Sequence, residues 1–366
     1  MPVELPRDDR PHDRLTEWWY YTGHLRDGSG GRWGFEFVIF RAERGSFPVS
    51  WASHLALTDE RNGTFRYDQR NEIGPQVDRS SGAGDGFALA ITGLGPALVG
   101  AGPGQAGPGP GPGSSATPPS PAGSPGALTP WLMGGLNGRD RLLADSSTAG
   151  FGLNLELVQS RAPALHDRDG WVDFGPAGGS YYYSRTRLSA AGTLRSGDST
   201  VAVQGTGWFD HQWGDFIAVG GGGWDWFAVN LDDGTDVTLS LVRARDGSYP
   251  LVYGTIVEAD GRARHLERRD FTVTSSGTWR SPRTGASYPA AWRIAIPADQ
   301  LTIDLRPTVA DQELDTRATT GVVYWEGSQV VEARRAGRPL GGEGYVELTG
   351  YDGITRDPGG SPAPSP

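Results

Sequence analysis

Several residue types and patterns are missing from this chain of 366 residues. It has no cysteine, which excludes disulfides and thiolate metal sites. Its 33 basic residues are all arginine, and no cluster of them forms a basic stripe. Because a nucleic-acid partner needs a basic surface, the net charge of −10 predicts that the chain binds no nucleic acid.

Long apolar runs are also missing. No segment approaches the roughly 20 apolar residues of a membrane span, and the first ten residues lack the apolar core of a secretory leader. We therefore expect a soluble protein, cytoplasmic or in peripheral contact with a membrane, or exported if a leader is missing. The six histidines, at positions 12, 24, 54, 166, 211 and 265, have no metal-ligand spacing. This spacing predicts no metal site.

Helical periodicity is almost absent, and the apolar segments are typical of strands. Residues 34–41 and 151–158 are rich in aromatic and aliphatic side chains. Asp-Gly pairs, which are typical of hairpin turns, occur at 27–28, 233–234, 246–247 and 260–261. This pattern predicts an all-β protein of antiparallel strands, closed into barrels so that few sheet edges remain.

A faint internal repeat suggests that there are two barrels. Residues 18–41 and 224–243 share an order of aromatic strand, Asp-Gly turn and apolar strand ending in arginine. We predict an N-terminal barrel at 1–215 and a C-terminal barrel at 216–356. A disordered Pro/Gly-rich insertion at about 95–130 would lie within the first barrel, and a disordered tail would follow at 357–366.

Tryptophan-dense segments carry the candidate chemistry. In a strand, Phe209, His211 and Trp213 would share one face, and Asp210 would point the other way. An imidazole among aromatic rings and beside a carboxylate can hold or relay a proton near neutral pH. The alternative is that His211 lies at a barrel mouth and bonds a backbone carbonyl.

The N-terminal aromatic segment offers a second candidate. Glu17, Trp19 and Tyr21 would share one strand face, and Trp18, Tyr20 and His24 the other. Inside a barrel, Glu17 would be an acid with a raised pKa; the alternative places Glu17 at the rim.

The same motifs, in this order, resemble a known family. These motifs occupy residues 11–12 (Pro-His), 17–25 (Glu-Trp-Trp-Tyr-Tyr-Thr-Gly-His-Leu), 53–59, 182–184, 208–214 (Trp-Phe-Asp-His-Gln-Trp-Gly), 223–227, 324–327 and 344–351. The sequence is similar to the bacterial lipocalin-like proteins that include carotenoid 1,2-hydratase (hydroxyneurosporene synthase) and the AttH-type proteins. The resemblance implies two calycin-like antiparallel β-barrels side by side, with a ligand cavity in or between them.

The resemblance also implies a chemistry. In the hydratase branch, water adds to the terminal double bond of an acyclic carotenoid without a cofactor, and the His-x-Trp pair of that branch matches His211 and Trp213. The branch also uses a tyrosine and an aspartate on the following strand. The corresponding stretch here has no tyrosine, and Asp225 is the nearest substitute for the aspartate.

Three functions therefore stand as hypotheses. In the first, a hydratase or lyase acts on an apolar, carotenoid-like isoprenoid alkene: Asp225 or Asp210, with His211 as relay, protonates the double bond, and tryptophan faces such as that of Trp213 stabilise the cation. In the second, the protein carries a lipid or another hydrophobic ligand without catalysis. In the third, it shapes a polyene for a pericyclic reaction. In each case we expect substrate or ligand contacts from Trp18, Tyr20, His24, His54, Tyr182, Trp224 and Trp226.

Overall fold

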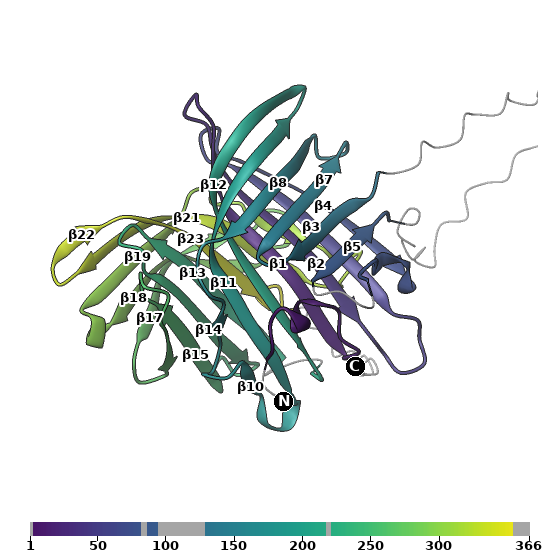
Figure 1. The fold of residues 1–366 in the computed structure, drawn as a ribbon. Coiled ribbons are helices and arrows are strands. Elements are labelled where there is room, and N and C mark those ends of the chain that lie inside the picture. The colour runs from purple at the N-terminus through teal and green to yellow at the C-terminus, as the bar shows by residue number, and fades with distance from the viewer. Residues whose placement is uncertain (1–2, 82–85, 94–128, 217–220, 354–366) are drawn as a thin grey trace, which may run out of the picture.

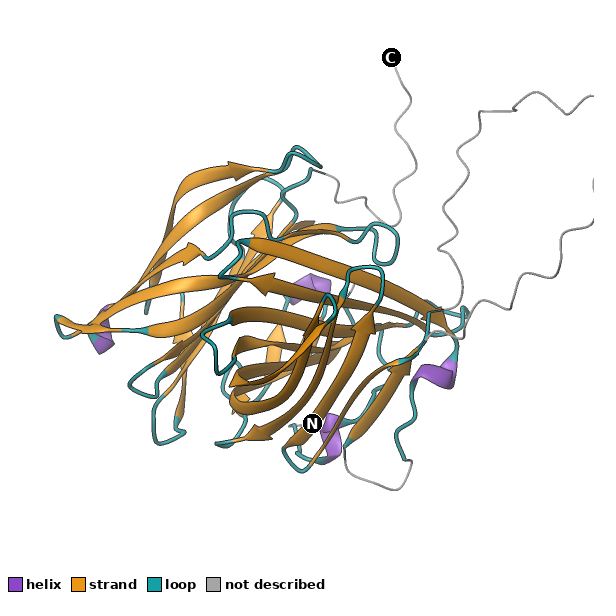
Figure 2. Cartoon of the chain, turned by 90° about the horizontal axis from the view of Figure 1, so that it is seen from above, coloured by secondary structure: helices purple, strands orange, loops and turns teal. Residues whose placement is uncertain are grey.

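The computed structural model describes residues 3–81, 86–93, 129–216 and 221–353. Within these residues the regular secondary structure is almost entirely β-strand, and the strands form two curled antiparallel sheets. Figure 1 shows the purple-to-teal strands of the first sheet beside the green-to-yellow strands of the second. In Figure 2 the only helices drawn are short purple turns. The all-β prediction with two barrel-like halves is confirmed.

The first sheet has the strand order β4-β3-β2-β1-β12-β11-β8-β7-β6-β5, and β9 and β10 pair with β11. Its strands are β1 (Thr16–Arg26), β2 (Arg32–Ala42), β3 (Ser50–Asp59), β4 (Thr64–Ile73), β5 (Phe87–Ile91), β6 (Trp131–Leu136), β7 (Arg139–Ser146), β8 (Phe151–Gln159), β9 (Ala164–Leu165), β10 (Trp171–Asp173), β11 (Gly179–Ser196) and β12 (Ser199–Gly214). Three 3-10 turns accompany them: η1 (Arg7–Asp9), η2 (Pro75–Val77) and η3 (Gly175–Ala177).

The second sheet has the order β16-β15-β14-β13-β23-β21-β19-β18-β17, and β20 and β22 pair with β21. Its elements are β13 (Gly221–Leu231), β14 (Asp236–Ala244), β15 (Leu251–Val257), β16 (Ala263–Glu267), β17 (Thr272–Arg280), β18 (Ser287–Ile296), η4 (Pro297–Asp299), β19 (Leu301–Pro307), β20 (Glu313–Asp315), β21 (Val323–Arg335), β22 (Arg338–Leu340) and β23 (Gly342–Thr349).

The two sheets repeat one topology. Each begins with a four-strand meander, β1 to β4 or β13 to β16, and its last long strand returns beside the first. The Asp-Gly pairs at 27–28, 233–234, 246–247 and 260–261 lie in the expected turns. Gly247 and Gly261 have φ of +82° and +86°, a left-handed conformation that glycine adopts at little cost. The strand order thus supports the internal repeat seen in the sequence.

Strand alternation divides the apolar side chains among three layers. One cluster fills the inside of the first sheet and a second fills the inside of the other. A third cluster lies between the sheets and contains Tyr20, Val38, Trp208, Trp226, Ala228 and Tyr345. Neighbouring residues of one strand therefore belong to different layers.

Side chains bridge the two edges of the first sheet. Arg70 of β4 donates to the carbonyl of Ile91 at the end of β5, at 3.2 Å, and its guanidinium lies 4.1 Å from the ring centroid of Trp131. Ser146, at the end of β7, donates to Asp68 of β4 at 2.7 Å. These contacts bring the sheet close to a closed barrel.

The predicted insertion at about 95–130 lies almost wholly outside the described residues, as does the predicted tail at 357–366. Strands β5 and β6, which flank the insertion in the chain, are hydrogen-bonded neighbours in the first sheet. Across the described ranges, no helix has both the length and the apolar character needed to cross a membrane.

Candidate functional site

Strand β12 presents its side chains to two different layers. Phe209 and Trp213 belong to the core inside the first sheet, and His211 lies between them on the same face. Trp208 belongs to the layer between the sheets, where its indole N–H donates to Asp210 at 2.7 Å. His211 and Asp210 therefore lie on opposite faces of the strand, so the expected relay between them is wrong.

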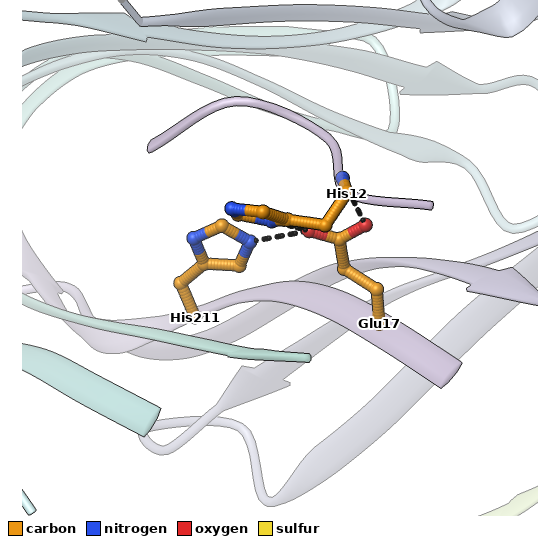
Figure 3. A group of neighbouring side chains, drawn as sticks. All are labelled: His12, Glu17 and His211. Carbon is orange, nitrogen blue, oxygen red and sulfur yellow. Dashed lines mark hydrogen bonds and ion pairs between the residues drawn. The ribbon is translucent and has the colours of Figure 1, made fainter. Parts of the chain in front are cut away.

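The carboxylate partner of His211 is Glu17, on the neighbouring strand β1 (Figure 3). Glu17 Oε1 lies 2.9 Å from His211 Nε2 and 2.7 Å from His12 Nδ1, and Oε2 accepts the backbone N–H of His12 at 2.9 Å. Glu17 and His211 are fully buried. The alternatives that placed Glu17 at the rim and bonded His211 to a backbone carbonyl are therefore wrong.

The charge state of Glu17 also differs from the expectation. Burial alone would raise the pKa of this carboxyl, but the hydrogen bonds from His12 and His211 outweigh it and lower the pKa. Burial lowers the pKa of His211, although Glu17 opposes the shift. The pair is therefore an ionised carboxylate beside an uncharged imidazole, and Glu17 is not an acid with a raised pKa.

Aromatic rings wall this group, as the tryptophan-rich sequence suggested. Trp19 stacks on His211 at 4.7 Å between ring centroids, and the ring of Trp213 lies 4.6 Å from His211. Trp213 also stacks on His12 at 4.1 Å with an interplanar angle of 1°. Packed rings therefore surround the buried imidazole of His211.

The N-terminal segment completes the wall. The carbonyl of Asp9 accepts the indole N–H of Trp19 at 3.1 Å, and the Asp9 carboxylate accepts the hydroxyl of Tyr183. Arg185 bridges Asp9 at 2.6 Å and Asp140 at 2.9 Å, and all three are buried. These bonds hold the residues before β1 against the inside of the first sheet.

Asp225 lies elsewhere. It is buried on β13, and its neighbour two residues on, Phe227, lies in the core of the second sheet. Its carboxylate pairs with Arg243 at 3.0 Å and accepts the hydroxyls of Tyr351 at 3.0 Å and Tyr249 at 3.3 Å. The expected cooperation of Asp225 with His211 is wrong, because each faces the inside of a different sheet.

Asp210 is the centre of a second polar group, which lies between the sheets. Its carboxylate accepts bonds from Trp208, from Ser184 and from the hydroxyl of Tyr182, which in turn accepts the indole N–H of Trp226 at 3.1 Å. Burial raises the pKa of Asp210 to about 6, and these hydrogen bonds oppose the shift. Predicted residues from both halves of the chain, Tyr182, Asp210 and Trp226, meet here.

Three glutamates share this layer. Tyr20 donates to Glu326 Oε1 at 2.7 Å, and Tyr324 donates to Glu36 Oε1 at 2.8 Å. Burial raises the pKa of Glu36 to about 8 and that of Glu326 well above its usual range, and the nearby glutamates add to both shifts. Loss of hydration raises the pKa of the half-buried Glu347 to about 7. The layer therefore holds carboxyl groups that stay protonated at neutral pH.

Two of the predicted histidines also lie between the sheets. His54 Nδ1 is 2.7 Å from the hydroxyl of Tyr324, and burial lowers the His54 pKa to about 3, which keeps the ring uncharged. His24 Nε2 lies 3.1 Å from the carbonyl of Gly344. Each histidine thus joins a strand of the first sheet to a strand of the second.

Aromatic side chains line one border of this layer. Trp18 packs edge-on against Phe40 at 6.4 Å and Phe216 at 5.8 Å between centroids. Trp224 is 40% exposed, and its indole lies near Glu347. These rings place an apolar, partly accessible border next to the buried carboxyl groups.

Two hollows in the described part of the chain lie away from both groups. One is lined by residues 137–139 and 158–161, and the other includes Leu165, Arg168 and His265. Neither is lined by a predicted site residue.

Sequence reasoning missed four of these residues. His12 is far from His211 in the chain, so no spacing linked the two. Glu36, Glu326 and Glu347 each stand in a strand beside aromatic or aliphatic residues. Glu326 and Glu347 each follow a tyrosine by two residues, at 324–326 and 345–347. Because residues two apart share a strand face, this spacing could have predicted that each glutamate lies beside a tyrosine.

Comparison with known proteins identifies the family. The AttH-like family model matches residues 1–93 and 116–351. The chain belongs to the AttH-like family. The resemblance found in the sequence motifs is confirmed. No curated protein sequence matches this chain.

Solved structures agree with the assignment to the AttH-like family. A protein described as AttH from Nitrosomonas europaea is 29% identical, with a TM-score of 0.76, and the match covers 96% of this chain and 97% of that one. Kievitone hydratase from Nectria haematococca is 15% identical, with a TM-score of 0.65 and coverage of 95% and 93%. CghA, solved with Sch210972, is 13% identical, with a TM-score of 0.55 and coverage of 92% and 89%. The last two likenesses show the fold alone.

Proposed function

We propose that this AttH-like protein is a cofactor-independent hydro-lyase that adds water to a double bond of an apolar, carotenoid-like isoprenoid, in the layer between its two sheets. The observation that carries the proposal is that a protonated carboxyl group and an ionisable one lie in the same buried, aromatic layer. Paired carboxyl groups with separated pKa values are the usual means of dividing acid and base roles. The hydratase among the proteins of similar fold supports the reaction class.

Glu326 is the proposed acid. It is 1% exposed, its Oε1 accepts the hydroxyl of Tyr20, and its Oε2 has no hydrogen-bond partner. A carboxyl group with a pKa raised well above the usual range carries a proton at neutral pH and can give it to an alkene carbon.

Asp210 is the proposed base. With a pKa of about 6 it is mainly ionised at neutral pH. Tyr20 links the two groups, because it lies opposite Asp210 in the β1–β12 register and donates to Glu326. Glu326 would protonate one alkene carbon, water would bond to the other, and Asp210 would take the proton that this water loses. Return of that proton to Glu326 restores the starting state.

The cation formed between these two steps needs stabilisation. The rings of Tyr20 and Trp226 are 5.4 Å apart, and those of Trp208 and Trp226 are 6.2 Å apart. Indole faces attract a carbocation through their negative quadrupole. Apolar walls also suit a hydrocarbon substrate, and Trp18 and Trp224 would contact it at the border of the layer.

Conversion of an acyclic carotenoid, presented in detergent micelles, tests the proposal. We expect Glu326→Gln and Asp210→Asn each to lower the hydration rate about a hundredfold or more, with the fold checked by circular dichroism. The matched control is Glu332→Gln, a carboxyl on the same strand as Glu326 with a side chain that is 67% exposed.

The proposal fails if both site variants hydrate the carotenoid as fast as the unaltered protein. Native mass spectrometry with extracted lipids distinguishes the proposed enzyme from the alternative, a carrier without catalytic activity. A lipid retained unchanged by the unaltered protein, without any turnover, would indicate a non-catalytic carrier of hydrophobic ligands.

A further inference from the structure

The group of His12, Glu17 and His211 is not used by the proposed reaction. It lies inside the first sheet, on the opposite face of β12 from Asp210. One ligand atom from each of the three side chains lies within 4.8 Å of the other two (Figure 3). Two imidazoles and one carboxylate are a ligand set that zinc accepts in proteins.

No permanently charged cation is paired with the carboxylate of Glu17 within the described residues. Its bonds are to two imidazoles and one backbone N–H, and within the described ranges no arginine lies at ion-pair distance from it. Elsewhere inside the same sheet the buried carboxylates of Asp9 and Asp140 are paired with Arg185. Hydrogen bonds alone balance the buried charge of Glu17, so the group lacks the opposite charge that a bound cation would supply.

Both imidazoles can bind an ion as neutral rings. Each ring now donates an N–H to Glu17. In the ion-bound state this proton must lie on the other ring nitrogen, so that the nitrogen facing Glu17 has a lone pair for the ion. For His12 that other ring nitrogen lies 3.8 Å from Asp8 Oδ1, which is longer than a hydrogen bond, so Asp8 would have to move closer to orient the ring as an outer-sphere carboxylate. For His211 it has no partner in the described chain, so only Glu17 fixes the present tautomer.

The three ligand atoms would have to rearrange to hold an ion. The nitrogen–oxygen distances of 2.7 and 2.9 Å suit hydrogen bonds, whereas ligand atoms around a tetrahedral zinc ion lie about 3.3 Å apart for bonds of about 2.0–2.1 Å. The ring of His12 can move away from Glu17, because His12 precedes β1 and its side chain is 21% exposed. Trp213 would keep the plane of the His12 ring, which it already stacks against.

We infer that His12, Glu17 and His211 form a binding site for a divalent transition-metal ion, with zinc as the ion that fits best. The ion would join β1, β12 and the N-terminal segment, and would leave a fourth position for water. The inference does not depend on the proposed hydro-lyase activity, because the two groups lie on different faces of the shared strands.

Titration of the full chain with zinc tests the site. The protein is prepared without a histidine tag, stripped with a chelator, and titrated by calorimetry, with bound cobalt followed by its visible absorption as a second readout. We expect one ion per chain, and about a hundredfold weaker binding in Glu17→Gln and in His12→Asn. The matched control is His265→Asn, because His265 lies on β16 of the second sheet. The zinc affinity of this variant should equal that of the unaltered chain.

The inference is overturned if the unaltered chain binds zinc no more tightly than the Glu17→Gln variant, or if His12→Asn leaves the affinity and the cobalt spectrum unchanged. His12→Asn keeps the test decisive should Glu17→Gln fail to fold, because His12 lies outside the strands. Zinc should also raise the melting temperature of the unaltered chain and not that of His12→Asn.

Discussion

Replacement of Glu36 by glutamine should make the protein increasingly more stable than the unaltered chain as the pH rises from 5 to 8. Glu36 is 1% exposed, Tyr324 donates to its Oε1, and its Oε2 has no hydrogen-bond partner. A glutamine amide copies the shape and the neutrality of the protonated carboxyl group. The variant should therefore fold as the unaltered chain does at low pH and differ from it as the pH rises.

The sign and size follow from the pKa of Glu36, which is about 8 in the folded chain against an ordinary value of 4.5. Between these values the unfolded chain releases the proton and the folded chain keeps it, so raising the pH favours unfolding. Each pH unit in that window costs about 1.4 kcal/mol. From pH 5 to pH 8 the unaltered chain should lose about 4 kcal/mol relative to Glu36→Gln.

Urea denaturation of both proteins at several values between pH 5 and pH 8.5 measures this difference. Glu332→Gln, which removes an exposed carboxyl, controls for the loss of one charge. Parallel pH dependences of the unaltered chain and Glu36→Gln would refute the reasoning, because they would mean that Glu36 ionises as readily in the folded chain as in the unfolded one.

Two further predictions concern stability. Arg185→Met should lower the free energy of unfolding by about 3–5 kcal/mol in urea, because it leaves two buried aspartates without their cation; a change below 1 kcal/mol would contradict this view of the bridge. Gly205→Ala should destabilise by about 3 kcal/mol, since its new methyl carbon would lie 1.8 Å from the backbone oxygen of His24, and a melting temperature equal to that of the unaltered chain would show that β1 and β12 can separate.

Much of the fold could be predicted from sequence because its signals are local. Asp-Gly pairs fixed turns, and alternation placed Trp19 and Tyr21 on one face of β1 and Tyr20 on the other. Alternation also separated His211 from Asp210, although the proposed relay ignored this. Local signals of this kind act over a few residues and need no knowledge of which strands pair.

The site needed information that no local pattern carries. Glu17 meets His211 only because β1 pairs with β12, and His12 only because the N-terminal segment lies against the inside of the first sheet. Glu36 and Glu326 share a layer because two sheets stack face to face. In sequence each is a single glutamate in an apolar strand, which also describes an exposed residue of an edge strand.

Strand β12 places side chains both in the core of the first sheet and in the layer between the sheets. This double role limits which changes of length the strand can tolerate. Inserting or deleting a single residue just before Asp210, with the pairing of the preceding residues kept, would turn His211 toward the second sheet and Asp210 toward the inside of the first. Both sets of partners would be lost in one event. Homologues should therefore keep the length of this segment constant, and any viable change of length there should come in pairs of residues.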